Sequence, residues 1–127
     1  MAKLPDLLNR VNKVKDPAAM TDLEKKHVPV IEAPDSVKAG LPFDVTVHVG
    51  KLLKHPNEPE HHIEWIELYK GYVFLARADL AAATTEPKVT FTVALEPELA
   101  ADDGLLRAFE KCNMHGVWEA AKPVNVA

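Results

Sequence analysis

Hydrophobic and polar residues alternate along several short segments, a pattern typical of β-strands with one buried face. The alternation is clearest in Asp44–Val49, which Gly50 ends, and in Lys88–Leu95. The remaining segments predicted as strands are Val28–Ile31, Ile63–Tyr69, Tyr72–Arg77, Leu105–Lys111 and Val117–Ala121. About seven short strands separated by turn signals predict an all-β fold, an immunoglobulin-like antiparallel β-sandwich.

The first part of the chain has a helical rather than an alternating pattern. Its apolar residues recur at three- and four-residue intervals and are Leu4, Leu7, Leu8, Val11 and Val14. This spacing predicts a short amphipathic helix over about residues 5–15. Thr21 and Glu24 have the spacing of a capping box and predict a second helical turn. We therefore divide the chain into an N-terminal helical extension, residues 1–22, and a β-sandwich domain, residues 23–127.

Composition and charge narrow the classes of function. The chain has 127 residues, of which 47% are hydrophobic and 27% charged, which is ordinary for a soluble globular protein. The net charge of −4 argues against nucleic acid as a partner, because nucleic-acid-binding proteins present a basic surface. The sequence shows neither a signal peptide nor an apolar run that could cross a bilayer, so we expect no membrane association. A single cysteine excludes an internal disulfide, favours a reducing compartment and predicts a cytoplasmic protein.

Cys112 and His115 are at the centre of the candidate chemistry. A thiolate and an imidazole three residues apart can bind one metal ion from a single tight turn. Three more histidines lie at breaks between predicted strands, where side chains from distant segments can converge: His27, His55 and His61. The loop between His55 and His61 contains two prolines, which lower the entropic cost of holding two imidazoles inward. These five side chains are candidates for a shared metal site.

Three segments around these residues carry a family resemblance; they are Glu24–Ile31, His55–Ile63 and Cys112–Gly116. In order and spacing they resemble the motifs of superoxide reductase, of the single-iron neelaredoxin class that is akin to the catalytic domain of desulfoferrodoxin. The resemblance covers about residues 24–121. We expect the extra iron domain of desulfoferrodoxin to be absent, because it would need further cysteines. The resemblance implies an oxidoreductase that converts superoxide to hydrogen peroxide with an external one-electron donor.

The resemblance also implies one mononuclear non-heme iron per chain, cycling between Fe(II) and Fe(III). Its equatorial ligands would be His27, His55, His61 and His115, and its axial ligand would be the thiolate of Cys112. His61 is preferred to His62 because the second loop histidine of the family follows the first by six residues. Nitrogen and sulfur donors suit iron, whereas magnesium or calcium would need oxygen donors. The backbone amides of Met114 and His115 are expected to hydrogen-bond the sulfur and tune the potential.

One departure from the family pattern concerns the two residues expected to assist catalysis. In the family, an uninterrupted Glu-Lys-His sequence supplies a lysine that attracts superoxide and a glutamate that caps the oxidised iron. Here the order is Glu24-Lys25-Lys26-His27. Alignment on His27 gives the lysine role to Lys26, and Glu24 would reach the iron only if the loop bulges by one residue. Glu24 is equally a candidate helix cap with Thr21, so both roles stay open.

Partners follow from the same resemblance. The substrate would be superoxide, and rubredoxin or a similar small carrier would supply electrons to the iron. We also expect a homo-oligomer, a tetramer or a dimer. Lysines cluster near the proposed ligands and predict a local positive field for an anion; they are Lys25, Lys26, Lys54 and Lys111. His48 lies on the polar side of its strand and is expected to face solvent.

The alternative function is electron transfer by a blue-copper-type β-sandwich protein, which also uses histidines and one cysteine. That site needs two histidines and a weak axial methionine after the last of them. Here Met114 precedes His115, no methionine follows, and four histidines are candidates. A structural zinc site is a third possibility, but it has four ligands where this chain offers five.

Overall fold

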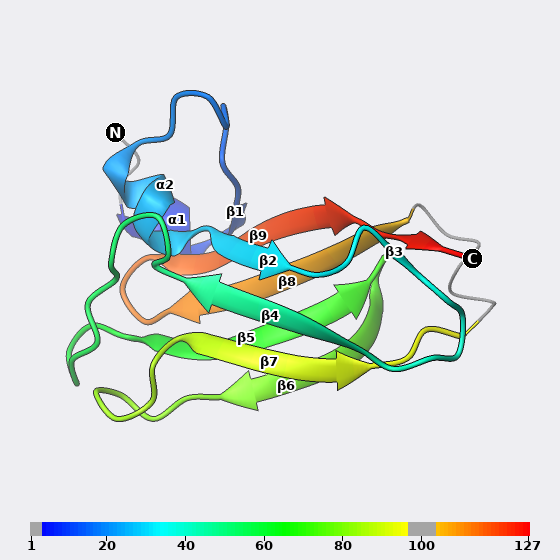
Figure 1. Ribbon diagram of the computed structural model, residues 1–127. Helices are drawn as coiled ribbons and strands as arrows, with labels where there is room; N and C mark the ends of the chain where they lie inside the picture. The colour runs from blue at the N-terminus through cyan, green and yellow to red at the C-terminus, as the bar shows by residue number, and fades with distance from the viewer. Residues whose placement is uncertain (1–3, 97–103) are drawn as a thin grey trace.

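Two β-sheets pack face to face in the computed structural model of the chain (Figure 1). The structure describes residues 4–96 and 104–127, so residues 1–3 of the predicted extension lie outside the described residues. The larger sheet has the order β1 (Val11–Asn12), β9 (Gly116–Pro123), β8 (Leu105–Cys112), β5 (Ile63–Lys70) and β6 (Val73–Asp79). The smaller sheet has the order β2 (Pro29–Glu32), β4 (Phe43–Val49) and β7 (Lys88–Val93). A parallel pair is formed by β10 (Asn125–Val126) and β3 (Ser36–Val37). The predicted all-β sandwich is confirmed.

The core lies between the sheets because alternate residues of their strands point inward. On β4 these are Val45, Val47 and Val49, each at most 1% exposed. Ile66 and Leu68 of β5 belong to the same buried cluster and are fully buried. Burying an aliphatic side chain of this size contributes about 1.5–3 kcal/mol to folding. The aliphatic core is thus a rigid frame for the loops at its ends.

The N-terminal segment differs from the predicted helix over residues 5–15. Helix α1 (Leu4–Leu8) ends after five residues, and β1 then pairs in parallel with β9. The prediction is wrong beyond Leu8 because β9 offers a sheet edge, and pairing with that edge overrides a weak local helix preference. The apolar residues predicted to share one buried helix face do not do so, since Leu7 is buried whereas Val11 is 47% exposed. The extension therefore adds a strand to the larger sheet.

Helix α2 (Asp22–His27) begins at the predicted capping box, which is confirmed. The amide of Glu24 donates to the hydroxyl of Thr21 at 3.1 Å, and the amide of Thr21 donates to the Glu24 carboxylate at 2.9 Å. The second carboxylate oxygen of Glu24 accepts a hydrogen bond from the amide of Lys15 at 3.0 Å. The helix ends at His27, before Pro29, because a proline disfavours helix in the residue that precedes it.

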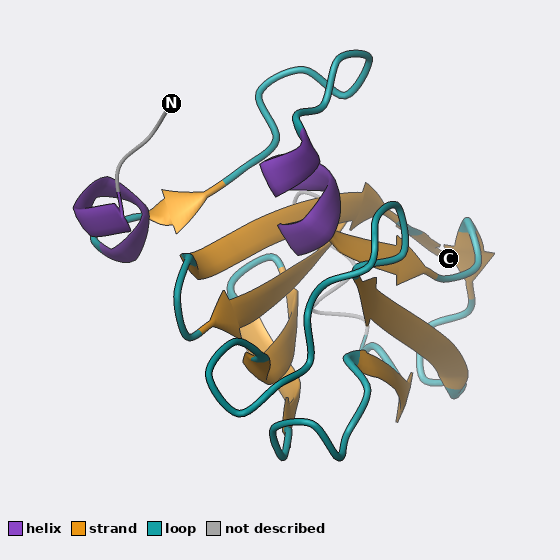
Figure 2. Cartoon of the chain, turned by 90° about the vertical axis from the view of Figure 1, so that its left-hand side faces the viewer, coloured by secondary structure: helices purple, strands orange, loops and turns teal. Residues whose placement is uncertain are grey.

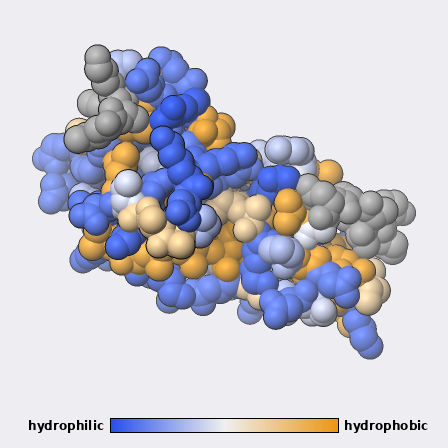
Figure 3. Space-filling model, turned by 90° about the horizontal axis from the view of Figure 1, so that it is seen from above, coloured by the Kyte–Doolittle hydropathy of each residue, from blue (hydrophilic) through white to orange (hydrophobic). Residues whose placement is uncertain are grey.

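Helices and loops gather at one end of the sandwich, which faces the viewer in Figure 2. Helix α2 lies over this end, and α1 and β1 lie at its side. Seen from above in Figure 3, the surface is mostly hydrophilic, with apolar patches between polar side chains, as on most globular proteins. None of the helices in the described part of the chain has the length and apolar character of a membrane-spanning segment.

Replacing Glu24 with glutamine is expected to destabilise the protein by about 1 kcal/mol at neutral pH, because an amide accepts hydrogen bonds more weakly than a carboxylate. Bonds from the backbone of Thr21 and Lys15 lower the pKa of Glu24 below its ordinary value of 4.5. The carboxylate's contribution is therefore complete above about pH 4.5 and is lost as the pH falls through the folded-state pKa. Urea unfolding of the metal-free protein measures this: the difference in the free energy of unfolding between wild type and variant should become smaller at acidic pH.

Asp22→Asn is the matched control, because Asp22 is an exposed acid in the first turn of the same helix. Asp22→Asn should lower the free energy of unfolding by less than half as much as Glu24→Gln does at neutral pH. An equal loss in both variants would assign the effect to the helix dipole rather than to the hydrogen bonds of Glu24.

Candidate metal centre

The predicted ligands come from separate elements that end at the same place. His27 is the last residue of α2, and Cys112 is the last residue of β8. His55 and His61 lie in the loop between β4 and β5, and His115 lies in the turn between β8 and β9. All of these segments end at the helix-and-loop end of the sandwich, so rigid elements bring the five side chains together.

The four imidazoles form a closed ring. Neighbouring ring centroids are 4.7–5.0 Å apart around the series His27, His55, His61 and His115. The ligand atoms of His27, His61, Cys112 and His115 all lie within 4.8 Å of one another. His55 is not in that group of four atoms, but its ring lies between those of His27 and His61. The sulfur of Cys112 is 3.6 Å from Nδ1 of His115.

Hydrogen bonds at the outer ring nitrogens leave the inner ones available for a metal ion. Nδ1 of His27 is 2.7 Å from the carbonyl of Leu23, and Nδ1 of His55 is 2.6 Å from the carbonyl of Pro56. Donation to these carbonyls places the proton on Nδ1 and the lone pair on Nε2. Within the described residues, the buried Nε2 atoms of His27, His55 and His61 have no hydrogen-bond partner. Buried polar atoms are normally paired, so these nitrogens fit a bound cation.

Burial also keeps the imidazoles in the neutral form that binds metals. It lowers the pKa of His27 to about 3 and the pKa of His55 to about 4. The pKa values of His61 and His115 are lowered as well, mainly by burial. The mutual repulsion of neighbouring imidazolium charges adds to the shift at His27 and His55. Near neutral pH, protons therefore compete only weakly with a metal ion for these nitrogens.

Burial raises the pKa of Cys112 to about 11, so the thiolate needs a nearby positive charge. The backbone amides of Met114 and His115 hydrogen-bond the sulfur, as predicted from the sequence, and they oppose that rise in pKa. A coordinated metal ion removes the thiol proton outright. The sulfur thus has the burial and the backbone donors of a metal ligand.

Comparison with known proteins identifies the family to which this chain belongs. The family model of desulfoferrodoxin matches residues 19–121 of this chain. The chain belongs to the desulfoferrodoxin family. Neelaredoxin from Megalodesulfovibrio gigas is 38% identical over 114 residues, which cover 79% of this chain and 87% of that protein. Superoxide reductase from Pyrococcus abyssi is 39% identical over 104 residues, which cover 75% of this chain and 84% of that protein.

A solved structure is similar over almost the whole length. It is the superoxide reductase (neelaredoxin) from Ignicoccus hospitalis, with a TM-score of 0.75 and 39% identity, covering 99% of this chain and all of that chain. The likeness therefore extends to the N-terminal residues that precede the family-model match.

The two residues expected to assist catalysis in this family lie in different surroundings. The positive charge of Lys26 helps to lower the pKa values of His55, His61 and His115, so it acts directly on the imidazole ring. Glu24 lies two residues earlier in α2, where both carboxylate oxygens accept hydrogen bonds from backbone amides. The structure thus places Lys26 beside the ring and uses Glu24 as a helix cap outside it.

Sequence reasoning did not identify Asn113 as part of the site. Its side-chain amide donates to the carbonyl of Glu60 at 2.8 Å and its oxygen accepts from the amide of His62 at 2.9 Å. These bonds fasten the Cys112 turn to the loop that carries His61. The only signal was a polar residue between Cys112 and His115, which does not by itself predict its partners.

Trp118 is 2% exposed, and its contacts support two of the candidate ligands. Its ring stacks on that of His27, with centroids 5.1 Å apart and planes at 21°. Its indole N–H donates to the carbonyl of His115 at 3.1 Å. Trp118 therefore fixes the orientation of His27 and the backbone of His115.

Gly50 lets the loop carrying His55 fold back onto the end of β4. Its φ of +84° is rarely adopted by other residues, and a Cβ at this position would lie 2.7 Å from the amide nitrogen of His55. A side chain here would push the loop outward. The position of His55 in the ring thus depends on a glycine five residues earlier.

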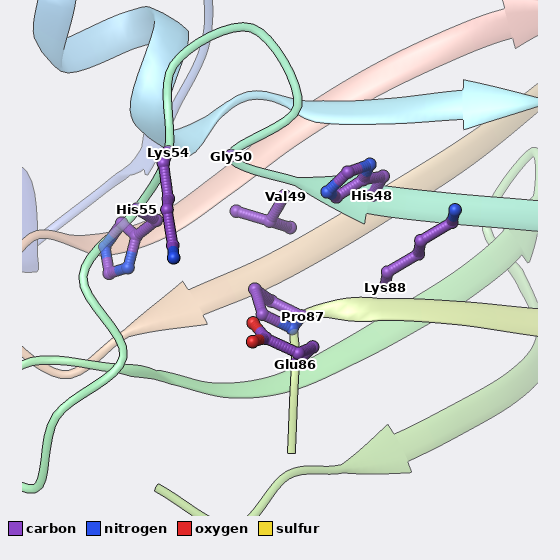
Figure 4. A pocket seen from close by; sticks show the side chains of 8 residues that line it. All are labelled: His48, Val49, Gly50, Lys54, His55, Glu86, Pro87 and Lys88. Carbon is purple, nitrogen blue, oxygen red and sulfur yellow. The ribbon is translucent and has the colours of Figure 1, made fainter. Parts of the chain in front are cut away.

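A pocket of about 330 Å³ opens beside His55 (Figure 4). Lys54 extends into it next to His55, while His48 and Lys88 lie at the other end and Glu86 lies below. His48, predicted to face solvent, is half-buried in this wall. The pocket adjoins the imidazole ring but is lined by none of the other predicted ligands.

Replacing His61 with alanine should reduce metal affinity at least about tenfold, since even residues that only support ligands contribute that much. His62→Ala is the matched control, because its backbone amide, which bonds Asn113, is retained in the variant. It should keep wild-type affinity. Metal content after dialysis against a chelator measures both variants. Equal metal loss in the two would contradict the choice of His61.

Proposed function

We propose that this chain is a superoxide reductase, which reduces superoxide to hydrogen peroxide at one mononuclear non-heme iron. The proposed ligands are His27, His55, His61, His115 and Cys112. The observation that carries the proposal is the closed ring of imidazoles, with unpartnered inner nitrogens, beside a buried sulfur. The names of the relatives in the desulfoferrodoxin family support the same activity.

The donor set favours iron over the alternatives. Four imidazoles and a thiolate exceed the four ligands of a structural zinc site. A blue-copper site would need a methionine at the metal after the last histidine, whereas Met114 precedes His115 and is 39% exposed. When bound, iron supplies the Fe(II)/Fe(III) couple that a one-electron reduction requires.

The side chains of the chain have distinct tasks in this reaction. The imidazoles, kept neutral by burial, would hold the iron. The sulfur of Cys112 provides a strongly donating ligand, and hydrogen bonds from Met114 and His115 moderate its donation. Lys26 is half-buried beside the ring and supplies the positive field that attracts an anionic substrate.

The overall reaction combines superoxide with one electron and two protons to give hydrogen peroxide. A single metal site stores only one electron, so each turnover needs an external donor. We assign this role to rubredoxin or a similar small electron-transfer protein. The single, buried cysteine fits a reducing cytoplasm.

A homo-oligomer, a tetramer or dimer, forms part of the proposal. The turn after β5 and the start of β6 expose Tyr72, Val73 and Phe74 at 75%, 48% and 53%. The guanidinium of Arg107 lies 4.7 Å over the ring of Tyr72. Aromatic residues and arginine are enriched in protein interfaces, which supports association through this turn. Light scattering of the purified protein tests the assembly.

Cys112→Ser should keep the fold but lose nearly all superoxide reduction. Cys112 is fully buried in the core cluster, but serine is close to it in size and should leave the packing intact, whereas donation to the metal needs the sulfur. The visible spectrum of the oxidised, iron-loaded wild type should contain a thiolate-to-Fe(III) charge-transfer band, and the variant should lack it. An iron-loaded variant with native activity and spectrum would refute the role of Cys112 as a ligand.

Lys26→Ala should slow the bimolecular step with superoxide by about tenfold at low ionic strength. The rate should also depend less on salt, because screening over about 10 Å at 0.1 M acts on the charge that has been removed. Pulse radiolysis over a salt series measures both quantities. The spectrum of the iron should barely change, because Lys26 is not a ligand.

Lys25→Ala is the matched control for this experiment. Lys25 precedes Lys26 in the same helix and is half-buried like it, but it is not among the charges that shift the pKa of His61 or His115 within the described residues. Its removal should change the association rate by less than about twofold. A larger effect of Lys25→Ala than of Lys26→Ala would move the steering role to Lys25.

A further inference from the structure

Most of the N-terminal extension precedes the family-model match, which begins at residue 19. Its residues 7–15, which we call the N-terminal strap, nevertheless contact two segments next to candidate ligands: β9, which follows His115, and α2, which ends at His27. One end of the strap packs on the start of β9, directly after His115, and the other end bonds the helix that ends in His27. The strap is therefore a physical link between ligands that are distant in the sequence.

The contact with the cysteine turn depends on Asn12, which is only 4% exposed. Its side-chain amide donates two hydrogen bonds of 2.9 Å, one to the carbonyl of Leu7 and one to the carbonyl of Val117. Its side-chain oxygen accepts from Nε of Arg10 at 2.8 Å. Asn12 thus joins the strap to the strand that leaves the metal centre.

The backbone of the strap approaches the turn too closely for any side chain to lie between them. A Cβ on Gly116 would collide with the carbonyl oxygen of Leu7. Gly116 has a φ of +81° and directly follows His115. The carbonyl of Leu7 that limits this space is the same one that Asn12 binds. The strap therefore restricts where the residue after His115 can move.

The other end of the strap acts on His27. The amide of Lys15 donates to the second carboxylate oxygen of Glu24 at 3.0 Å, and Glu24 caps the helix that ends at His27. Asn12 is also paired in register with Trp118, whose ring stacks on His27. Two separate routes thus connect the strap to the same imidazole.

We propose that the N-terminal strap positions the metal ligands and that Asn12 is its main positioning residue. Asn12 touches no ligand itself; it acts through Val117 and Trp118. This inference rests on the proposed metal site, but not on superoxide as its substrate. Without the amide donors of Asn12, the carbonyls of Leu7 and Val117 lose these hydrogen bonds, and β1 separates from β9. The turn then holds His115 less firmly, and bound metal is lost faster.

Asn12→Asp tests the proposal because it keeps the shape of the side chain and replaces its donors with a carboxylate that repels both carbonyls. Asn9→Asp is the matched control: the same substitution at an exposed position in the same strap. Asn12→Ala is a second variant, which removes the donors without adding charge. All variants are made in the full chain, and urea unfolding of each metal-free protein establishes that it folds.

The primary measurement is the rate at which Fe(II)-loaded protein transfers its metal to a chelator. We expect about tenfold faster transfer from Asn12→Asp and Asn12→Ala than from Asn9→Asp, the scale typical of residues that support ligands. The charge-transfer band of the oxidised protein should also shift in the two Asn12 variants only. A purely structural role would lower stability without moving that band.

Hydrogen exchange at the amides of Val117 and Trp118 reports whether the strap has separated from β9. Faster exchange together with faster metal release and a shifted band supports the proposal. Faster exchange with the wild-type release rate and spectrum would overturn it, because the strap would then be detached without effect on the ligands. Wild-type behaviour in all three measurements would overturn it too. None of these measurements depends on superoxide reduction. A failure of the strap proposal can therefore be distinguished from a failure of the proposed activity.

Discussion

The structure depends on one constraint: several candidate metal-ligand atoms are buried together without partners among the described residues. The Nε2 atoms of His27, His55 and His61 are shielded from water and receive no hydrogen bond from those residues. Each such group costs on the order of 1–3 kcal/mol, and an isolated buried thiolate would cost more. A bound cation offsets these costs at once, so metal binding and folding should be coupled. Without the metal, the site opposes the fold that forms it.

The sandwich meets this cost by placing the candidate ligands at the ends of α2 and β8 and in the adjoining loops, and by tying these segments to one another. Asn113 joins the cysteine turn to the His61 loop, and Trp118 joins the same turn to His27. Such ties hold a ligand in place at little entropic cost, because the elements beneath them are already fixed by the aliphatic core.

Much of the fold and of the candidate ligand set could be predicted from the sequence because those signals are local. Alternation in segments such as Asp44–Val49 reports which face of a strand is buried, and the spacing of Thr21 and Glu24 reports a capping box. The helix expected beyond Leu8 failed because the edge of β9, more than a hundred positions away in the sequence, competes for that segment. The bond between Asn12 and Val117 spans 105 residues and has no local signature.

Glu24 shows how one sequence pattern can support two roles that geometry separates. Its carboxylate is charged because two backbone amides stabilise it, and the same bonds direct it to the start of α2. To reach the metal it would have to release both amides, at a cost of about 1.5–3 kcal/mol for each bond to a charged group. Lys26, two residues on, needs no such exchange, because its charge acts through space on the imidazoles. In Glu24-Lys25-Lys26-His27 the two roles are thus separated: Glu24 caps the helix, and the charge of Lys26 acts on the imidazoles.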